Sequence, residues 1–165
     1  MDKNKVLITG GAGYLGSTLT EVLLDNGYHV DVLDNLLYEQ TSLLHLCSHK
    51  NFRFINTDVT YFKFLKTIVS AYDVVIPLAA IVGGPACDKN KELATKVNFE
   101  QIKCIVDNIT DNQKLIMPNT NSQYGSSSEV ITEDSPFNPL SHYALTKCDA
   151  ENYILNNKSG VCLRL

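Results

Sequence analysis

The chain has 165 residues, of which 44% are hydrophobic and 19% charged, a length and composition typical of one compact domain. Fourteen basic residues against eighteen acidic ones give a net charge of -4, and no basic stripe follows the chain, which argues against a nucleic-acid partner. The longest apolar run, Val74–Val82, is far shorter than the roughly 20 residues of a membrane helix, and the polar N-terminus lacks a signal-peptide core, so we expect a cytoplasmic protein without a membrane partner.

Short β-branched segments alternate with longer helical patterns along the chain. The predicted strands are Val6–Thr9, Val30–Leu33, Phe52–Asn56, Val74–Ile76, Lys114–Met117 and Val161–Leu165. The predicted helices are Leu15–Asn26, Thr41–Ser48, Phe62–Val69, about Lys89–Ile109, and Ser141 to about Asn156. This alternation predicts an α/β fold: a doubly wound parallel sheet of the Rossmann type, with helices on both faces, forming one domain over residues 1–165.

A glycine-rich segment, Thr9–Gly16, joins the first predicted strand to the first predicted helix. Its glycines fit both GxxGxxG, starting at Gly10, and GxGxxG, starting at Gly11. The first glycines permit a tight turn, Gly13 lets the backbone approach a pyrophosphate, and the helix N-terminus offers free N–H groups. The context of strand, turn and helix predicts a dinucleotide site, and the alternative is a turn that serves packing alone.

A carboxylate, Asp34, follows the second predicted strand, eighteen residues after Gly16. In that position it can accept hydrogen bonds from the adenosine ribose hydroxyls and repel the additional phosphate of NADP. The first arginine in the chain is Arg53, so none lies nearby to bind that phosphate, and NAD is the expected cofactor. The alternative is that Asp34 caps the segment Asn35–Gln40. Asp58, after the third strand, is placed to approach the adenine, although its Asp-Val-Thr turn has an equally good local explanation.

Of the eight tyrosines only Tyr143 has a lysine four residues later, Lys147, inside a predicted helix. Residues at this spacing share a helix face, so the ammonium can lie beside both the phenol and the cofactor ribose. A free tyrosine, with a pKa of about 10, is a poor base at neutral pH, but a fixed cation and an oxidised nicotinamide would lower that pKa. The pair therefore predicts proton exchange with a sugar hydroxyl.

The connection Asn119–Leu140 is about twenty residues long and rich in Ser, Asn and Pro, as functional or disordered loops are. The five cysteines form no CxxC motif and the four histidines form no HExxH motif, so no metal site is predicted. Cys87 lies close to the expected path of the substrate, but no basic neighbour would turn it into a thiolate, and we expect it to be structural.

Several motifs together resemble the extended short-chain dehydrogenase/reductase family, the NAD-dependent nucleotide-sugar epimerases and dehydratases. They are TGGAGYLG at residues 9–16, DNL at 34–36, LAA at 78–80, Asn98, TNSQYG at 120–125 and YALTK at 143–147. The likeness runs from Lys5 to Leu165 with the motifs in the family's order.

The resemblance implies a catalytic role for three residues. Tyr143 would be the acid/base, Lys147 would hold the nicotinamide ribose, and the Thr120 hydroxyl would bind the reacting sugar oxygen, with Ser122 as the alternative. The implied cofactor-binding residues are Gly10, Gly13, Tyr14, Leu15, Gly16, Asp34, Asn35, Asp58, Val59, Leu78, Ala79, Ala80, Asn98, Tyr143 and Lys147.

The residues after Thr120 narrow the expected reaction. Family members that dehydrate sugars have an Asp and a Glu there, whereas this chain has Asn121 and Ser122, neither of which is a strong acid or base at neutral pH. We therefore expect a nucleotide-sugar epimerase, acting at carbon 4 by transient hydride transfer to tightly bound NAD. The alternatives are a dehydrogenase/reductase or dehydratase and, from another class, a non-catalytic NAD-binding or sensing module.

The resemblance also implies a second, C-terminal region that binds the nucleotide-diphosphate sugar. That region is expected to be absent here, because the chain ends on its sixth strand, and the isolated piece is expected to bind cofactor without turning over substrate. Family members often dimerise through a four-helix bundle, so a homodimer through the helices that begin near Lys89 and Ser141 is a further expectation.

Overall fold

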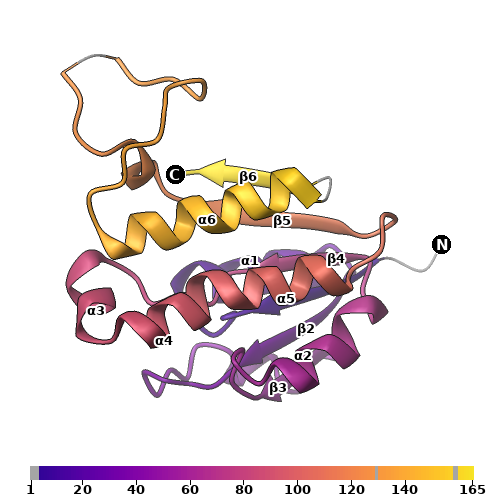
Figure 1. Cartoon of the computed structure of the whole chain (residues 1–165). Coiled ribbons are helices and arrows are strands. Elements are labelled where there is room, and N and C mark those ends of the chain that lie inside the picture. The colour runs from indigo at the N-terminus through magenta and orange to yellow at the C-terminus, as the bar shows by residue number, and fades with distance from the viewer. Residues whose placement is uncertain (1–3, 129, 158–159) are drawn as a thin grey trace.

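The computed structural model describes residues 4–128, 130–157 and 160–165. Within them, the strands form one parallel sheet in the order β3-β2-β1-β4-β5-β6 (Figure 1). Their bounds are β1 (Lys5–Thr9), β2 (His29–Asp34), β3 (Phe52–Asn56), β4 (Val74–Pro77), β5 (Lys114–Asn119) and β6 (Gly160–Arg164). This is the strand order of a dinucleotide-binding doubly wound sheet, and the predicted fold class is confirmed.

Helices cover the two faces of the sheet unequally (Figure 1). The helix α1 (Tyr14–Asp25) buries Leu24 against one face, in a cluster with Ile8 and Val32. The opposite face is covered by α2 (Phe62–Ile68), α5 (Gln101–Asn108) and α6 (His142–Asn157). Successive strand residues point to opposite sides, so a strand that is buried along its whole length, such as β4, supplies apolar side chains to both clusters.

The predicted helix over residues 41–48 is wrong, because the structure has only a 3₁₀ turn, η1 (Leu44–Leu46), in this segment. A helix this short needs a continuous apolar stripe against the core. Here Leu43 is buried, but Leu44 is 66% exposed. Leu43 and the partly buried Leu46 anchor a turn, but they do not form the continuous stripe that a helix needs.

The long helix predicted from about Lys89 to Ile109 is confirmed as one continuous run over residues 91–108, made of α4 (Lys91–Thr95), a π-helical turn η3 (Lys96–Glu100) and α5. A short helix that the sequence did not predict, α3 (Gly84–Lys89), precedes it. The two are separated at Asn90, whose side chain accepts a hydrogen bond from the Leu93 N–H and so caps α4. Asparagine favours this N-cap role, which explains why the helix restarts there.

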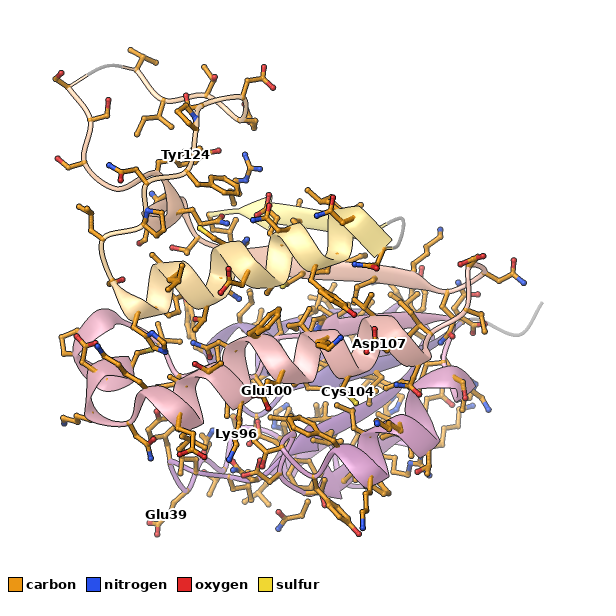
Figure 2. All side chains as sticks on the ribbon, viewed as in Figure 1. Glu39, Lys96, Glu100, Cys104, Asp107 and Tyr124 are labelled. Atoms are coloured by element: carbon orange, nitrogen blue, oxygen red, sulfur yellow. The ribbon has the colours of Figure 1, made fainter. Side chains whose placement is uncertain are left out.

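A 3₁₀ turn, η2 (Val69–Ala71), precedes β4, and another, η4 (Asn121–Tyr124), follows β5. Beyond η4, the connection to α6 forms a loop that projects from the body of the domain, with Tyr124 at its base (Figures 1 and 2). No helix in the described part of the chain combines the length and the apolar character needed to cross a bilayer.

Candidate active site

A cavity of about 620 Å³ opens at the carboxyl ends of the central strands. It lies where the strand order reverses between β1 and β4, the place at which doubly wound sheets bind ligands. Most of the predicted site residues line it: Gly10, Gly13, Tyr14, Leu15, Gly16, Asp34, Asn35, Leu78, Ala79, Ala80, Tyr143 and Lys147. The volume falls in the range of about 300 to 1,000 Å³ that is typical of ligand pockets.

The glycine turn forms one wall of this cavity and has no room for side chains. Gly10 has a φ of 69°, and a Cβ atom there would lie 2.4 Å from the Ala79 nitrogen. At Gly16 a Cβ would lie 2.5 Å from the Gly11 Cα, so α1 packs directly on the turn. No side chain caps the start of α1 at Gly13. Its first N–H groups therefore remain available for an anion, as a dinucleotide pyrophosphate requires.

Asp34 holds the glycine turn in place from the end of β2. One carboxylate oxygen accepts a hydrogen bond from the Ala12 N–H at 3.0 Å, and the other accepts one from the Leu36 N–H at 2.8 Å. The alternative reading, in which Asp34 caps the following segment, is thus part of its role. Each carboxylate oxygen has a further lone pair, which a ribose hydroxyl can use, and the side chain lines the cavity.

Asp58 and Val59 do not line the cavity. Val59 is buried in the core, and Asp58 lies behind Asn35, whose side-chain amide donates to it at 2.8 Å. Burial alone would raise the pKa of Asp58, but hydrogen bonds from Thr60 and Asn35 outweigh that effect and lower the pKa. Asp58 is therefore a carboxylate that positions the cavity residue Asn35.

Asn98 does not line the cavity either, and its side chain instead holds the segment after β4. It is buried, accepts a hydrogen bond from the Ile81 N–H at 2.8 Å, and donates one to the Ile81 carbonyl at 3.0 Å. Gln101, a residue that the sequence analysis missed, donates to the Ala79 carbonyl at 2.6 Å and accepts from the Thr9 hydroxyl. Two buried side-chain amides on one helix thus fix residues 79–81. The sequence signal for this role is a pair of polar residues on an otherwise apolar helix face.

Tyr143 and Lys147 line the end of the cavity that faces α6. Burial raises the pKa of Tyr143, the nearby Cys87 thiol raises it further, and the Thr120 side chain lowers it. Lys147, which was expected to lower this pKa, is not among the groups that shift it, and its ammonium donates to the Pro118 carbonyl at 3.2 Å. Burial lowers the pKa of Lys147 to about 8.

Thr120 lies at the cavity's edge, directly after the lining residue Asn119. Its hydroxyl donates to the Ser122 hydroxyl at 3.1 Å and accepts from the Ser122 N–H at 3.2 Å. Ser122 is exposed, whereas Thr120 is half-buried and is the hydroxyl that interacts with Tyr143. This geometry favours Thr120 over the alternative, Ser122.

Among the residues that the structure describes, Asp34 is the only carboxylate that lines the cavity, and it lies at the end away from Tyr143. The Cys87 thiol donates to the Ile81 carbonyl at 3.2 Å, and burial raises its pKa, as expected for a structural cysteine. No group of three potential metal ligands occurs in the described ranges.

The sequence analysis did not identify the lining residues Leu37, Tyr38, Gln40, Pro77, Val82, Pro118 and Asn119.

Several known proteins are similar to this chain in sequence. The chain is 36% identical over 156 residues to a UDP-glucuronate 4-epimerase of Thermodesulfobacterium geofontis, covering 88% of this chain and 48% of that protein. It is 33% identical over 134 residues to a UDP-N-acetyl-alpha-D-glucosaminuronate decarboxylase of Bacillus cytotoxicus, covering 80% of this chain and 41% of that protein. The chain spans about half the length of these relatives.

A solved structure supports the same relationship. The crystal structure of UDP-glucuronic acid 4-epimerase from Bacillus cereus, in complex with UDP-glucuronic acid and NAD, matches with a TM-score of 0.85 and 30% identity. The match covers 97% of this chain and 55% of that one. The model of the NAD dependent epimerase/dehydratase family matches residues 6–164. This chain therefore belongs to the NAD dependent epimerase/dehydratase family.

Proposed function

We propose that this chain binds NAD and that the natural full-length protein epimerises a nucleotide sugar at carbon 4. A UDP-sugar is the first candidate substrate. The observation that carries the proposal is that Tyr143 and Lys147 line one end of the cavity with Thr120 at its edge, and that no carboxylate among the described residues lines that end. Elimination of water needs an additional acid and base, whereas epimerisation needs only one residue that accepts and returns a proton.

The cavity has the features that a dinucleotide requires. The uncapped start of α1 would bind the pyrophosphate, and Asp34 would bind the adenosine ribose. Gly10 lets the turn pack directly against the backbone of Ala79, and both segments line the cavity. When bound, NAD would accept a hydride from the sugar and return it.

Each catalytic side chain would have a separate task. Tyr143 would remove the proton from the sugar hydroxyl and give it back, and Thr120 would donate a hydrogen bond to the same oxygen. The Lys147 ammonium, held by the Pro118 carbonyl at 3.2 Å, would reach the nicotinamide ribose and favour the phenolate of Tyr143 once that site is filled. We therefore propose Thr120, Tyr143 and Lys147 as the catalytic residues.

Product analysis of the full-length protein with UDP-, dTDP-, GDP- and CDP-sugars tests the proposal. An epimerase interconverts two sugars with catalytic NAD and accumulates no NADH. Stoichiometric NADH absorbance would instead identify a dehydrogenase or reductase, and loss of carbon dioxide from a UDP-uronic acid would identify a decarboxylase like the Bacillus cytotoxicus relative. Binding of NAD without turnover of any sugar would indicate a sensing module.

We further propose a homodimer through α5 and α6, in a cytoplasmic protein that binds neither nucleic acid nor membranes. Leu145 and Leu155 on α6 are 46% and 55% exposed. Between the helices, Phe99 and Tyr153 form an edge-on aromatic pair with ring centres 6.1 Å apart. Light scattering of the full-length protein should give twice the chain mass, and the variant Leu145→Glu should halve it. A monomeric wild-type protein would refute the dimer.

A further inference from the structure

Arg164, at the end of β6, connects the last strand to α6 and to both ends of the projecting loop. Its Nε donates to Glu151 Oε1 at 2.9 Å, and its Nη2 donates to the same oxygen. Its Nη1 donates to the Tyr124 hydroxyl at 2.5 Å and to the Glu133 carbonyl at 2.7 Å. The guanidinium also lies over the rings of Tyr124 and Phe137, 5.5 and 4.9 Å from their centres. Every nitrogen of this side chain is therefore engaged.

Glu151 carries the connection from Arg164 to the catalytic segment. Its side chain is 1% exposed, and its second oxygen accepts a hydrogen bond from the side-chain amide of Asn119. Asn119 lines the cavity and immediately precedes Thr120. The residue after Arg164, Leu165, also holds the backbone on both sides of Thr120. Its N–H donates to the Asn119 carbonyl at 3.3 Å, and its carbonyl accepts from the Asn121 N–H at 2.9 Å.

We propose that the Glu151–Arg164 pair is a positioning device, which fixes Thr120 opposite Tyr143 by holding the residues on both sides of Thr120. This inference rests on the proposed function. Asn119 is anchored through Glu151, and Tyr124 is anchored directly by the guanidinium, so the turn that contains Thr120 is held at both ends. Only arginine offers a planar fork that can serve a carboxylate and a phenol together. Catalysis is sensitive to errors of about 1 Å in such placement.

The opposite end of the sheet provides a matched control. There Arg53 Nε donates to Asp31 Oδ2 at 2.9 Å, and the Tyr72 hydroxyl donates to the same oxygen at 2.5 Å. Arg53 also donates to the Tyr72 hydroxyl at 3.1 Å. This cluster has the same three chemical groups, but none of its members lines the cofactor cavity. A substitution at Arg53 therefore measures how much kcat and NAD affinity change when an arginine network is lost away from the cavity.

The test compares Arg164→Lys with Arg53→Lys in the full-length protein, because lysine keeps the charge and loses the fork. We expect Arg164→Lys to lower kcat by roughly 10- to 100-fold while the NAD affinity stays within about twofold, and Arg53→Lys to leave both nearly unchanged. In a Thr120→Val background the additional loss from Arg164→Lys should shrink to less than about threefold, because coupled residues are not additive. An equal loss in both backgrounds, or from both arginines, would overturn the inference.

A second measurement does not depend on turnover. In the NAD complex, the Thr120 methyl resonance, assigned with Thr120→Ser, should shift in Glu151→Gln and Arg164→Lys and stay in place in Arg53→Lys. If the wild-type protein epimerises no sugar, the proposed function fails while this resonance still decides the positioning inference. An unshifted Thr120 methyl in both Glu151→Gln and Arg164→Lys would refute it.

Discussion

The two halves of the cavity are built by different means. On the β1–α1–β2 side the wall is backbone: Gly10 packs directly against Ala79, no side chain caps the start of α1, and Asp34 is held by two main-chain donors. On the β5–α6–β6 side the wall is a network of side chains, in which Glu151 joins Arg164 to Asn119. Under the proposed function, the first half would recognise the cofactor by shape and helix dipole, whereas the second would position the reacting groups. Substitutions in the backbone half should therefore abolish NAD binding, and substitutions in the side-chain half should abolish turnover.

The largest effect is expected from Gly10→Ala in the backbone half. The new Cβ would lie 2.4 Å from the Ala79 nitrogen at a φ of 69°, so the turn must move. We expect NAD affinity to fall by more than about 100-fold, with a lower melting temperature, measured by titration calorimetry and thermal unfolding. The control is Gly84→Ala, where the nearest atom would be 3.4 Å away, and an equal loss in both variants would erase the distinction.

Tyr143→Phe tests the other half by removing a single hydroxyl. We expect kcat to fall by roughly 1,000-fold, because acid-base catalysis of this kind contributes about 10²- to 10⁴-fold. NAD affinity should remain within about twofold of the wild type, because the backbone half is untouched. Steady-state kinetics of the full-length protein provide the measurement, and a variant that keeps its kcat would remove Tyr143 from the mechanism.

Asp34→Ala should act on the cofactor alone. The substitution removes the acceptor for the ribose and frees the Ala12 N–H, so we expect NAD affinity to fall by roughly 10- to 100-fold, the loss of one or two charged hydrogen bonds. Asp31→Ala, on the same strand but outside the cavity, should leave affinity unchanged. Equal NAD affinity for wild type and Asp34→Ala would contradict the assignment of this carboxylate.

Lys147→Met should stabilise the ligand-free protein while it abolishes turnover. Burial lowers the pKa of Lys147 from 10.5 to about 8, so the folded state carries an unfavourable buried charge below pH 8. Removing it should raise the free energy of unfolding at pH 7 by about 1 to 3 kcal/mol. The gain should diminish as the pH rises from 8 towards 10.5, where the wild-type lysine loses its proton on folding. Denaturant titrations at several pH values measure this, and destabilisation at pH 7 would contradict it.

The sequence predicted the backbone half well because its signals are local. The glycine turn and Asp34 lie within one βαβ unit, and each residue type has a direct steric or charge reason for its place. The predicted strands and the helices α1 and α6 also agree with the structure within about two residues at each end. Local patterns failed at residues 41–48, which form only a 3₁₀ turn, and they did not predict the short helix α3.

The network of the second half could not be derived in the same way. Glu151 and Arg164 are ordinary surface residues by type, and only the fold brings them to Asn119 and Tyr124. Asn98, which the resemblance gave as a cofactor-binding residue, holds the segment after β4 from behind and does not line the cavity. Contacts between residues distant in the chain determine such roles, and no pattern of spacing encodes them.

The π-helical turn η3 makes the number of residues between α4 and α5 important, because that number sets how the two helices are rotated relative to each other. The turn contains one residue more than a regular helix needs, and this changes the phase between α4 and α5. Thr95 can thereby contact His142 while Gln101 still points at the Ala79 carbonyl. Deletion of a single residue within η3 would restore a regular helix and rotate α4 by about 100° relative to α5. Evolution can therefore exchange side chains here more easily than it can alter their number.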